Sequence, residues 1–164
     1  MTTSRPIVLI VGGGHAGLEA AFAAARVGAA VRVVTGSIGT VGQTPCNPSV
    51  GGVAKGHLVA EIDALGGFMG RAADATCIHG RVLNRSKGPA VRSTRLQVDK
   101  AKYGVFAREA LTTHPGIEVI EGLVSDLLFE PGATERICGV RLADGSEVSA
   151  DAVVVTTGTF TIPL

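Results

Sequence analysis

Three glycines near the N-terminus have the spacing of a phosphate-binding turn. Gly12, Gly14 and Gly17 form G-x-G-x-x-G between the apolar run 7–11 and an alanine-rich stretch. In such a turn the first glycine permits the bend, the second lets the backbone approach a pyrophosphate, and the third allows close helix–strand contact. Free N–H groups and the dipole at the helix start favour negative charge. The stretch predicts a nucleotide cofactor bound by Gly12, Gly13, Gly14, His15, Ala16 and Gly17.

The segments around the glycines are those that such a turn requires. Residues 7–11 have the β-branched composition of a strand buried on both faces of a parallel sheet, residues 16–27 have a helical apolar face, and residues 31–34 form a second strand. The second strand ends in Thr35, where a dinucleotide site usually has an acid that bonds the ribose. The pattern therefore favours a phosphate-binding turn over a standard NAD site. A glycine turn that only packs an α/β sheet is the structural alternative.

Cys46 is the second candidate for chemistry. It lies in the glycine-rich segment 36–56, which has no helical or alternating apolar period and is predicted to be a long loop. Long loops in compact domains commonly bind something. Pro45 and Pro48 restrict the backbone around the thiol. From chemistry alone, Cys46 is either a small apolar residue in a tight turn or a thiol beside a cofactor, activated by N–H groups or Lys55.

Basic residues are concentrated in one part of the chain. Seven of them lie between Arg81 and Lys102 against a single acid, whereas the remainder has a net charge of −5. Within this part, residues 83–95 form a donor-rich turn that contains Lys87 and Arg92 and no acid. This turn predicts either a solvated basic loop or a surface that binds phosphate or another anion.

The remaining pattern indicates one α/β domain. A chain of 164 residues with 46% apolar and 18% charged residues can bury a normal core. We expect two helices, one over 57–69 with Leu58, Ile62 and Leu65 on one face, and one over 94–113. We also expect strands at 117–120 and 122–130 and a hairpin around 143–146. A buried strand at 151–156 should follow, with Thr157, Gly158 and Thr159 directly after it.

The cysteines and the apolar runs exclude several classes of protein. Three widely spaced cysteines, Cys46, Cys77 and Cys138, indicate neither a disulfide framework nor a zinc site, and no metal site is predicted. The first apolar run is too short for a membrane span or a secretory leader. We therefore expect a cytoplasmic protein without a membrane-spanning segment.

Four blocks of sequence carry a resemblance to a known family. They are VGGGHAGLEAA at 11–21, GQTPCNPSVGGVAKGHLVAEIDALGG at 42–67, LNRSKGPAVRSTRLQVDK at 83–100 and VVVTTGTF at 153–160. In this order and spacing they resemble the N-terminal FAD-binding region of the GidA/MnmG family, the tRNA uridine 5-carboxymethylaminomethyl modification enzymes. The resemblance covers residues 7–160.

The resemblance implies a fold and a set of site residues. The fold is a Rossmann-like, three-layer FAD/NAD(P)-binding α/β fold with a parallel sheet and a β-hairpin or meander, truncated, in which residues 1–164 form the N-terminal portion of an FAD-binding domain of the two-dinucleotide-binding type. FAD is implied on the glycine turn, and Thr35 is ordinary at its position in the family. Cys46 matches the functional cysteine and is implied as catalytic. Lys87, Arg92 and Arg95 match a basic block that contacts flavin, folate or tRNA phosphate. The further cofactor contacts are Thr35, Lys87, Arg92, Thr157, Gly158 and Thr159.

The resemblance also implies an activity and partners. Members install a carboxymethylaminomethyl or aminomethyl group at C5 of the wobble uridine of certain tRNAs, with NADH as reductant and methylenetetrahydrofolate as one-carbon donor. They work with the GTPase MnmE, and full-length members are homodimers. Members are several times longer than this chain, so we expect no complete reaction and weak FAD retention from these residues alone. The alternatives are a non-catalytic nucleotide-binding module and a generic FAD or NAD oxidoreductase.

Overall fold

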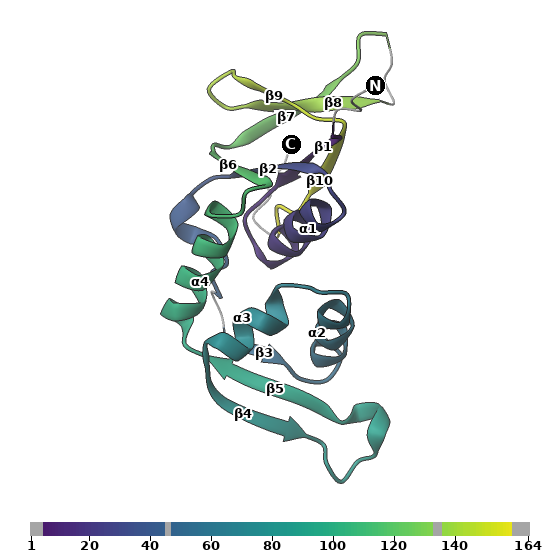
Figure 1. Cartoon of the computed structure of the whole chain (residues 1–164), viewed down its shortest axis with the longest axis vertical. Helices are drawn as coiled ribbons and strands as arrows, with labels where there is room; N and C mark the ends of the chain where they lie inside the picture. Colours follow the sequence, from purple (N-terminus) through teal and green to yellow (C-terminus); the bar gives the residue numbers. More distant parts are fainter. Residues whose placement is uncertain (1–4, 45–46, 133–135, 159–164) are drawn as a thin grey trace. The chain divides into compact units, whose positions relative to one another are not determined.

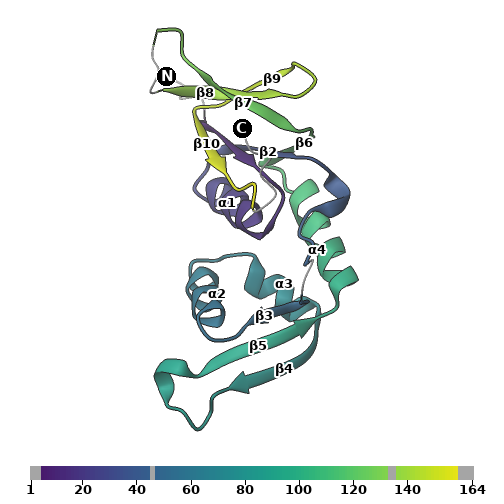
Figure 2. The same ribbon diagram turned by 180° about the vertical axis from the view of Figure 1, so that it is seen from behind.

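A computed structural model describes residues 5–44, 47–132 and 136–158 of the chain (Figure 1, Figure 2). The chain divides into two compact units, of which the first comprises Met1–Val41 and Arg108–Leu164 and the second comprises Gly42–Ala107. Among the described residues, no helix has the length and apolar character needed to cross a membrane. The same ranges contain no cluster of three His, Cys, Asp or Glu side chains that could hold a metal ion.

A parallel sheet of four strands, in the order β10-β1-β2-β6, forms the centre of the first unit (Figure 1). Its strands are β1 (Ile7–Val11), β2 (Ala30–Thr35), β6 (Ile117–Glu121) and β10 (Ala152–Val155). The chain passes from β1 outward through β2 to β6, and then returns to the other side of β1 as β10. The direction of winding therefore changes between β1 and β10. Open α/β sheets bind ligands at such a point, beyond the carboxyl ends of the strands.

Helix α1 (His15–Arg26) connects β1 to β2 and packs on the sheet. Leu18 and Ala21 are buried on its inner face. The chain leaves the helix at Gly28, whose φ of 94° is the left-handed conformation that glycine adopts after a helix. These elements confirm the strand, turn, helix and strand predicted for residues 7–34.

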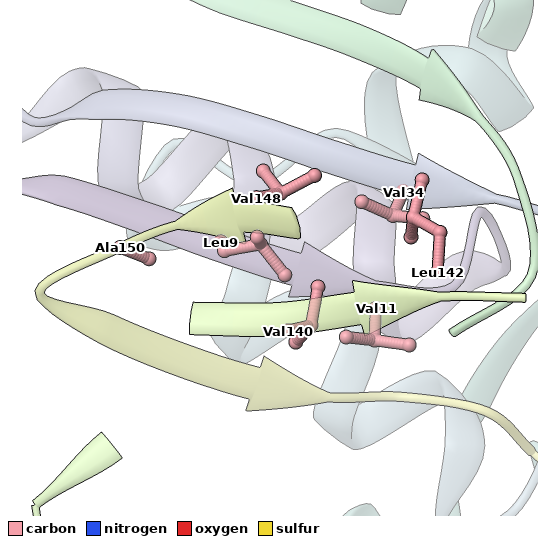
Figure 3. Packing of buried hydrophobic residues seen from close by; sticks show 7 residues of the cluster. All are labelled: Leu9, Val11, Val34, Val140, Leu142, Val148 and Ala150. Carbon is pink, nitrogen blue, oxygen red and sulfur yellow. The ribbon is translucent and has the colours of Figure 1, made fainter. Parts of the chain in front are cut away.

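An antiparallel meander completes the core of the first unit. It consists of β7 (Val124–Phe129), β8 (Ile137–Leu142) and β9 (Glu147–Ser149), which confirms the predicted hairpin. Figure 3 shows the side chains that join the two sheets, which are Leu9, Val11 and Val34 from the parallel sheet, Val140, Leu142 and Val148 from the meander, and Ala150 directly after β9. Each fully buried Val or Leu contributes about 1.5–3 kcal/mol to stability.

The second unit is a three-stranded antiparallel sheet with two helices on one face. Its strands β3 (Ser49–Gly51), β5 (Ser93–Val98) and β4 (Cys77–Leu83) pair in the order β3-β5-β4. Helices α2 (Lys55–Ala64) and α3 (Met69–Ala75) both contact β3 and β5. Short 3-10 turns occur at Ile38–Thr40 in the first unit and at Pro89–Val91 in the second.

Two predictions of secondary structure are wrong in part. The predicted helix over 94–113 begins only at Lys100, as α4 (Lys100–Thr112), because residues 93–98 form β5. The carboxylate of Asp99 starts the helix, since its Oδ1 accepts hydrogen bonds from the backbone N–H groups of Ala101 at 3.0 Å and Lys102 at 3.1 Å. The predicted loop 36–56 contains the turn Ile38–Thr40, strand β3 and the start of α2.

Two predictions of burial are also wrong. Leu58 and Leu65 of the predicted amphipathic helix are 59% and 76% exposed, and only Ile62 of the predicted apolar face is half-buried. Strand β10 was expected to be buried, yet Val155 is 57% exposed because β10 is the outer strand of the described sheet.

Candidate nucleotide-binding site

The chain bends sharply at Gly12, directly after β1. Gly12 has a φ of 112°, and a Cβ added there would lie 2.5 Å from the carbonyl oxygen of Thr156. Its N–H donates to the carbonyl oxygen of Val34 at 2.8 Å, which joins the bend to the end of β2. Only glycine fits this position, because both its backbone conformation and the adjacent carbonyl exclude a side chain.

Gly17 lets the first turn of α1 lie against the bend. A Cβ at Gly17 would collide with the carbonyl oxygen of Gly12 and would lie 2.9 Å from Thr156 Oγ1. Thr156 follows β10, and its hydroxyl donates to the carbonyl oxygens of Val11 at 2.8 Å and Gly12 at 3.3 Å. The carboxyl ends of β1 and β10 and the N-terminus of α1 therefore meet at one point.

Thr35 and Gly13 form the side of the site next to β2. Thr35 is buried, and its hydroxyl donates to the carbonyl oxygen of Ser37 at 3.4 Å. A Cβ at Gly13 would lie 2.9 Å from Thr35 Oγ1 and 2.8 Å from Val41 Cγ2. Thr35 and Val41 thus pack against the glycine turn at Gly13 and leave no room there for a larger residue.

The N-terminus of α1 is open to an approaching anion. Gly14 is the N-cap residue, no side chain caps the helix, and the first turn contains no acidic residue. No heavy atom lies within 4 Å of the position that a Cβ on Gly14 would occupy. His15 and Ala16 follow in the first turn, where Ala16 is exposed. The backbone here is close to solvent, the first turn of α1 has no carboxylate, and the helix dipole points its positive end at the site. These features suit the binding of a pyrophosphate.

The other predicted site residues have different positions. Thr157 and Gly158 are exposed and follow Thr156 at the same edge of the sheet. Thr159 and Cys46 lie outside the described residues, so the predictions for them stay predictions. Lys87 and Arg92 belong to the second unit, and their contact with the cofactor stays a prediction.

The basic loop of the second unit is folded on itself. Asn84 Nδ2 donates to the carbonyl oxygen of Val91 at 3.0 Å, and Arg92 Nη2 donates to that of Arg85, also at 3.0 Å. Lys87 is exposed at the tip. Arg92 lines a groove of about 310 Å³ between the sheet and its helices, whereas Arg95 lines a different cavity. The predicted basic block is therefore divided between two surfaces.

Thr156 is the residue of the site that sequence reasoning missed. It contacts the positions of both Gly12 and Gly17, although 144 residues separate it from Gly12. The available signal was a threonine directly after the β-branched run 153–155, at the carboxyl end of a predicted parallel strand. Pairing of that strand with β1 brings the hydroxyl to the glycine turn.

Comparison with known proteins identifies close relatives. Two tRNA uridine 5-carboxymethylaminomethyl modification enzymes MnmG, from Granulibacter bethesdensis and Thermus thermophilus, are 55% and 57% identical to this chain over 153 residues. The aligned residues are 93% of this chain but only 24% and 25% of those proteins. The chain therefore spans about a quarter of the length of the curated relatives it matches.

Solved structures agree with the sequence relatives. Aquifex aeolicus GidA matches with a TM-score of 0.89 and 44% identity, over 96% of this chain and 26% of that one. A GidA-related protein from Thermus thermophilus has a TM-score of 0.64 at 22% identity, over 96% of this chain and 55% of that one, which supports the fold alone. The fold is the predicted Rossmann-type, FAD-binding α/β fold. The family described as glucose inhibited division protein A matches residues 7–162, and the chain belongs to this family.

Proposed function

We propose that this chain is the FAD-binding N-terminal part of an enzyme that modifies tRNA, installing a carboxymethylaminomethyl or aminomethyl group at C5 of the wobble uridine. The names of the relatives that are 55% and 57% identical support the reaction class. The observation that carries the cofactor assignment is the glycine turn, where Gly12, Gly17 and Thr156 meet at the uncapped N-terminus of α1.

The residues of the first unit fit the ADP end of FAD. The turn from Gly12 to Gly17 presents backbone N–H groups and the helix dipole to the pyrophosphate. Gly14 leaves space for its approach, and Thr157 and Gly158 extend the site along the same sheet edge. Thr35 lies beside Gly13 and contributes no carboxylate near the phosphates. When bound, FAD supplies redox chemistry that no side chain can supply.

The remaining parts of the proposal rest on family membership. Cys46 serves as a functional thiol, and Lys87, Arg92 and Thr159 contact the cofactor. NADH is the reductant and methylenetetrahydrofolate the one-carbon donor, and the partners are tRNA, the MnmE GTPase and a second copy of the longer protein. The residues of this chain carry out no complete reaction by themselves, and the protein acts in the cytoplasm.

A competition experiment tests the cofactor assignment. FAD is titrated into the purified chain and its fluorescence is followed, first alone and then in the presence of ADP or FMN. Because the glycine turn binds the ADP end, ADP should displace FAD whereas FMN should not. Binding of FMN as tight as that of FAD, or the absence of any flavin binding, would contradict the assignment.

A substitution in the longer protein tests the thiol. Cys46→Ser should abolish formation of the modified wobble uridine, measured by mass spectrometry of tRNA nucleosides from cells that carry only the variant. Cys138→Ser, which changes a partly buried cysteine of β8, is the matched control and should leave the modification in place. Modified uridine in the Cys46→Ser cells at the wild-type level would remove the thiol from the mechanism.

A further inference from the structure

One face of the three-stranded sheet in the second unit is cationic. Side chains alternate along a strand, so one face carries Val50 and Leu96, which line the groove toward α2 and α3. The other face, called the outer face below, carries Ser49, His79, Arg81, Arg95 and Gln97. The strand register aligns Ser49, Gln97 and His79 in one row across the three strands, and Gly51, Arg95 and Arg81 in the next.

The outer face is hollowed by a cavity of about 330 Å³. Its lining consists of Asn47, Pro48, Ser49, His79, Arg81, Leu83, Arg95 and Gln97, and it contains no carboxylate. Arg95 Nη2 donates to Ser49 Oγ at 3.2 Å, which fixes one guanidinium at the wall. Among the described residues, neither Arg81 nor Arg95 forms an ion pair with an acid.

This arrangement of charge is unfavourable for a surface that faces only water. Arg81 and Arg95 lie directly opposite each other on antiparallel strands, and like charges in that position destabilise a sheet. A solvated sheet face commonly mixes the two signs of charge, whereas this one has cations and neutral hydrogen-bonding groups. An anion between the two guanidinium groups would remove the repulsion.

The lining also indicates which anion fits. A guanidinium group binds phosphate through paired N–H donors, and serine, histidine and glutamine side chains add hydrogen bonds to phosphate oxygens. No Phe, Tyr or Trp side chain lines the cavity, so a base could stack only on the His79 ring or on the guanidinium groups that a phosphate also uses. The chemistry suits a phosphate in a nucleic-acid backbone better than a nucleotide held by its base.

We propose that the outer face binds the phosphodiester backbone of RNA, with Arg81 and Arg95 contacting phosphate oxygens and Ser49, His79 and Gln97 supplying hydrogen bonds. The proposal rests on the proposed function, because the RNA it identifies is the tRNA substrate. It assigns this contact to residues of β3, β4 and β5 in the second unit, none of which belongs to the glycine turn.

Salt-dependent RNA binding tests the proposal. The full 164-residue chain is titrated with a fluorescently labelled, unmodified tRNA at several salt concentrations, and anisotropy gives the dissociation constant. Each phosphate contact contributes about 0.7–0.9 to the slope of log K against log salt. Arg81→Gln with Arg95→Gln should therefore lower the slope by about 1.4–1.8, if each arginine contacts one phosphate. It should also weaken binding at least tenfold at low salt.

Two further variants separate this site from general charge and from misfolding. Arg71→Gln with Lys100→Gln removes the same charge from α3 and the start of α4, and should change the slope much less. Arg81→Lys with Arg95→Lys keeps both charges and should retain most of the slope. Equal slope losses in the two glutamine variants, when circular dichroism shows both to be folded, would overturn the proposal.

Ligand identity and flavin binding are measured with the same preparations. Displacement of the tRNA by inorganic pyrophosphate or by polyglutamate at the same concentration of charge would overturn the assignment to an RNA backbone. FAD binding is recorded for every variant. A chain that binds FAD but not tRNA contradicts only the inference about the outer face, whereas one that binds tRNA through Arg81 and Arg95 but not FAD contradicts only the cofactor assignment.

Discussion

Replacing Gly17 with alanine should destabilise the first unit, whereas the same change at Gly14 should have almost no effect. Gly17 is buried, and a Cβ there collides with the carbonyl oxygen of Gly12 and lies 2.9 Å from Thr156 Oγ1. Gly14 has open space at the same position and a φ of −77°, which alanine adopts without strain. The two substitutions add the same methyl group to the same turn and differ only in what it meets.

The structure sets the size of the effect. Overpacking costs about 1–3 kcal/mol, and the cost at Gly17 is at the upper end because the obstacle is a backbone carbonyl. Alanine within a helix recovers about 1 kcal/mol relative to glycine. The net loss is about 2 kcal/mol, or roughly 4–8 °C in Tm for a chain of this size. At Gly14 the small loss at the N-cap and the gain from a stiffer unfolded chain cancel to within about 0.5 kcal/mol.

Thermal unfolding followed by circular dichroism gives the Tm of both variants. FAD titration of the same samples measures how tightly the glycine turn binds the cofactor. Gly17→Ala should lower Tm and weaken FAD binding, because the helix must move away from the bend at Gly12. Gly14→Ala serves as the control for the added methyl group. Equal melting temperatures for the two variants would refute the packing of α1 on the glycine turn as the reason for Gly17.

Two further predictions concern other turns. Gly51→Ala should be less stable to urea than Gly52→Ala by about 1–3 kcal/mol. Both glycines have a φ near 100°, but only a Cβ at Gly51 collides with the carbonyl oxygen of Thr94, so equal losses would contradict this reason. Ser146→Ala should raise the pKa of Asp144, since hydrogen bonds from the Ser146 hydroxyl and N–H hold that pKa below its ordinary value. Because the folded-state pKa of Asp144 is lowered, its hydrogen bonds with Ser146 stabilise the turn fully above the ordinary pKa, and this stabilisation is lost as the pH falls through the folded-state pKa. An unchanged pKa of Asp144 in an NMR titration of the variant would argue against Ser146 as the cause.

The sequence was most informative where neighbouring residues form the structure together. The strand, turn, helix and strand of residues 7–34 follow from two hydrophobic periods and one glycine motif within thirty residues. The hairpin β8-β9 follows likewise from an Asp-Gly turn between an apolar run and a short segment around Val148. In both cases the local preferences agree with the final packing.

Prediction failed where distant segments decide the outcome. Residues 93–98 read as the start of a helix because Leu96 fits the apolar stripe of α4, yet pairing with β3 and β4 makes them a strand. Thr156 reaches Gly12 only through the pairing of β10 with β1, which no local pattern reports. The exposure of Leu58 likewise depends on what packs on α2.

The division of the basic segment follows from the period of two along β5, and it leads to a last prediction. Arg92 lies on the side of Thr94 and Leu96, whereas Arg95 lies with Gln97 on the outer face opposite Arg81. At low salt, Arg81→Gln should raise the free energy of unfolding by about 0.2–1 kcal/mol, because it removes the repulsion between two opposed cations.

A double-mutant cycle in urea isolates this repulsion. Arg95→Gln should gain less than Arg81→Gln, since it also loses the exposed hydrogen bond to Ser49. The double variant should gain less than the sum of the two single gains, because the same repulsion is removed only once. The coupling should fade in about 1 M salt, where the screening length falls to about 3 Å. Strict additivity at low salt would show that the two guanidinium groups do not face one another, and would remove the basis for an anion between them.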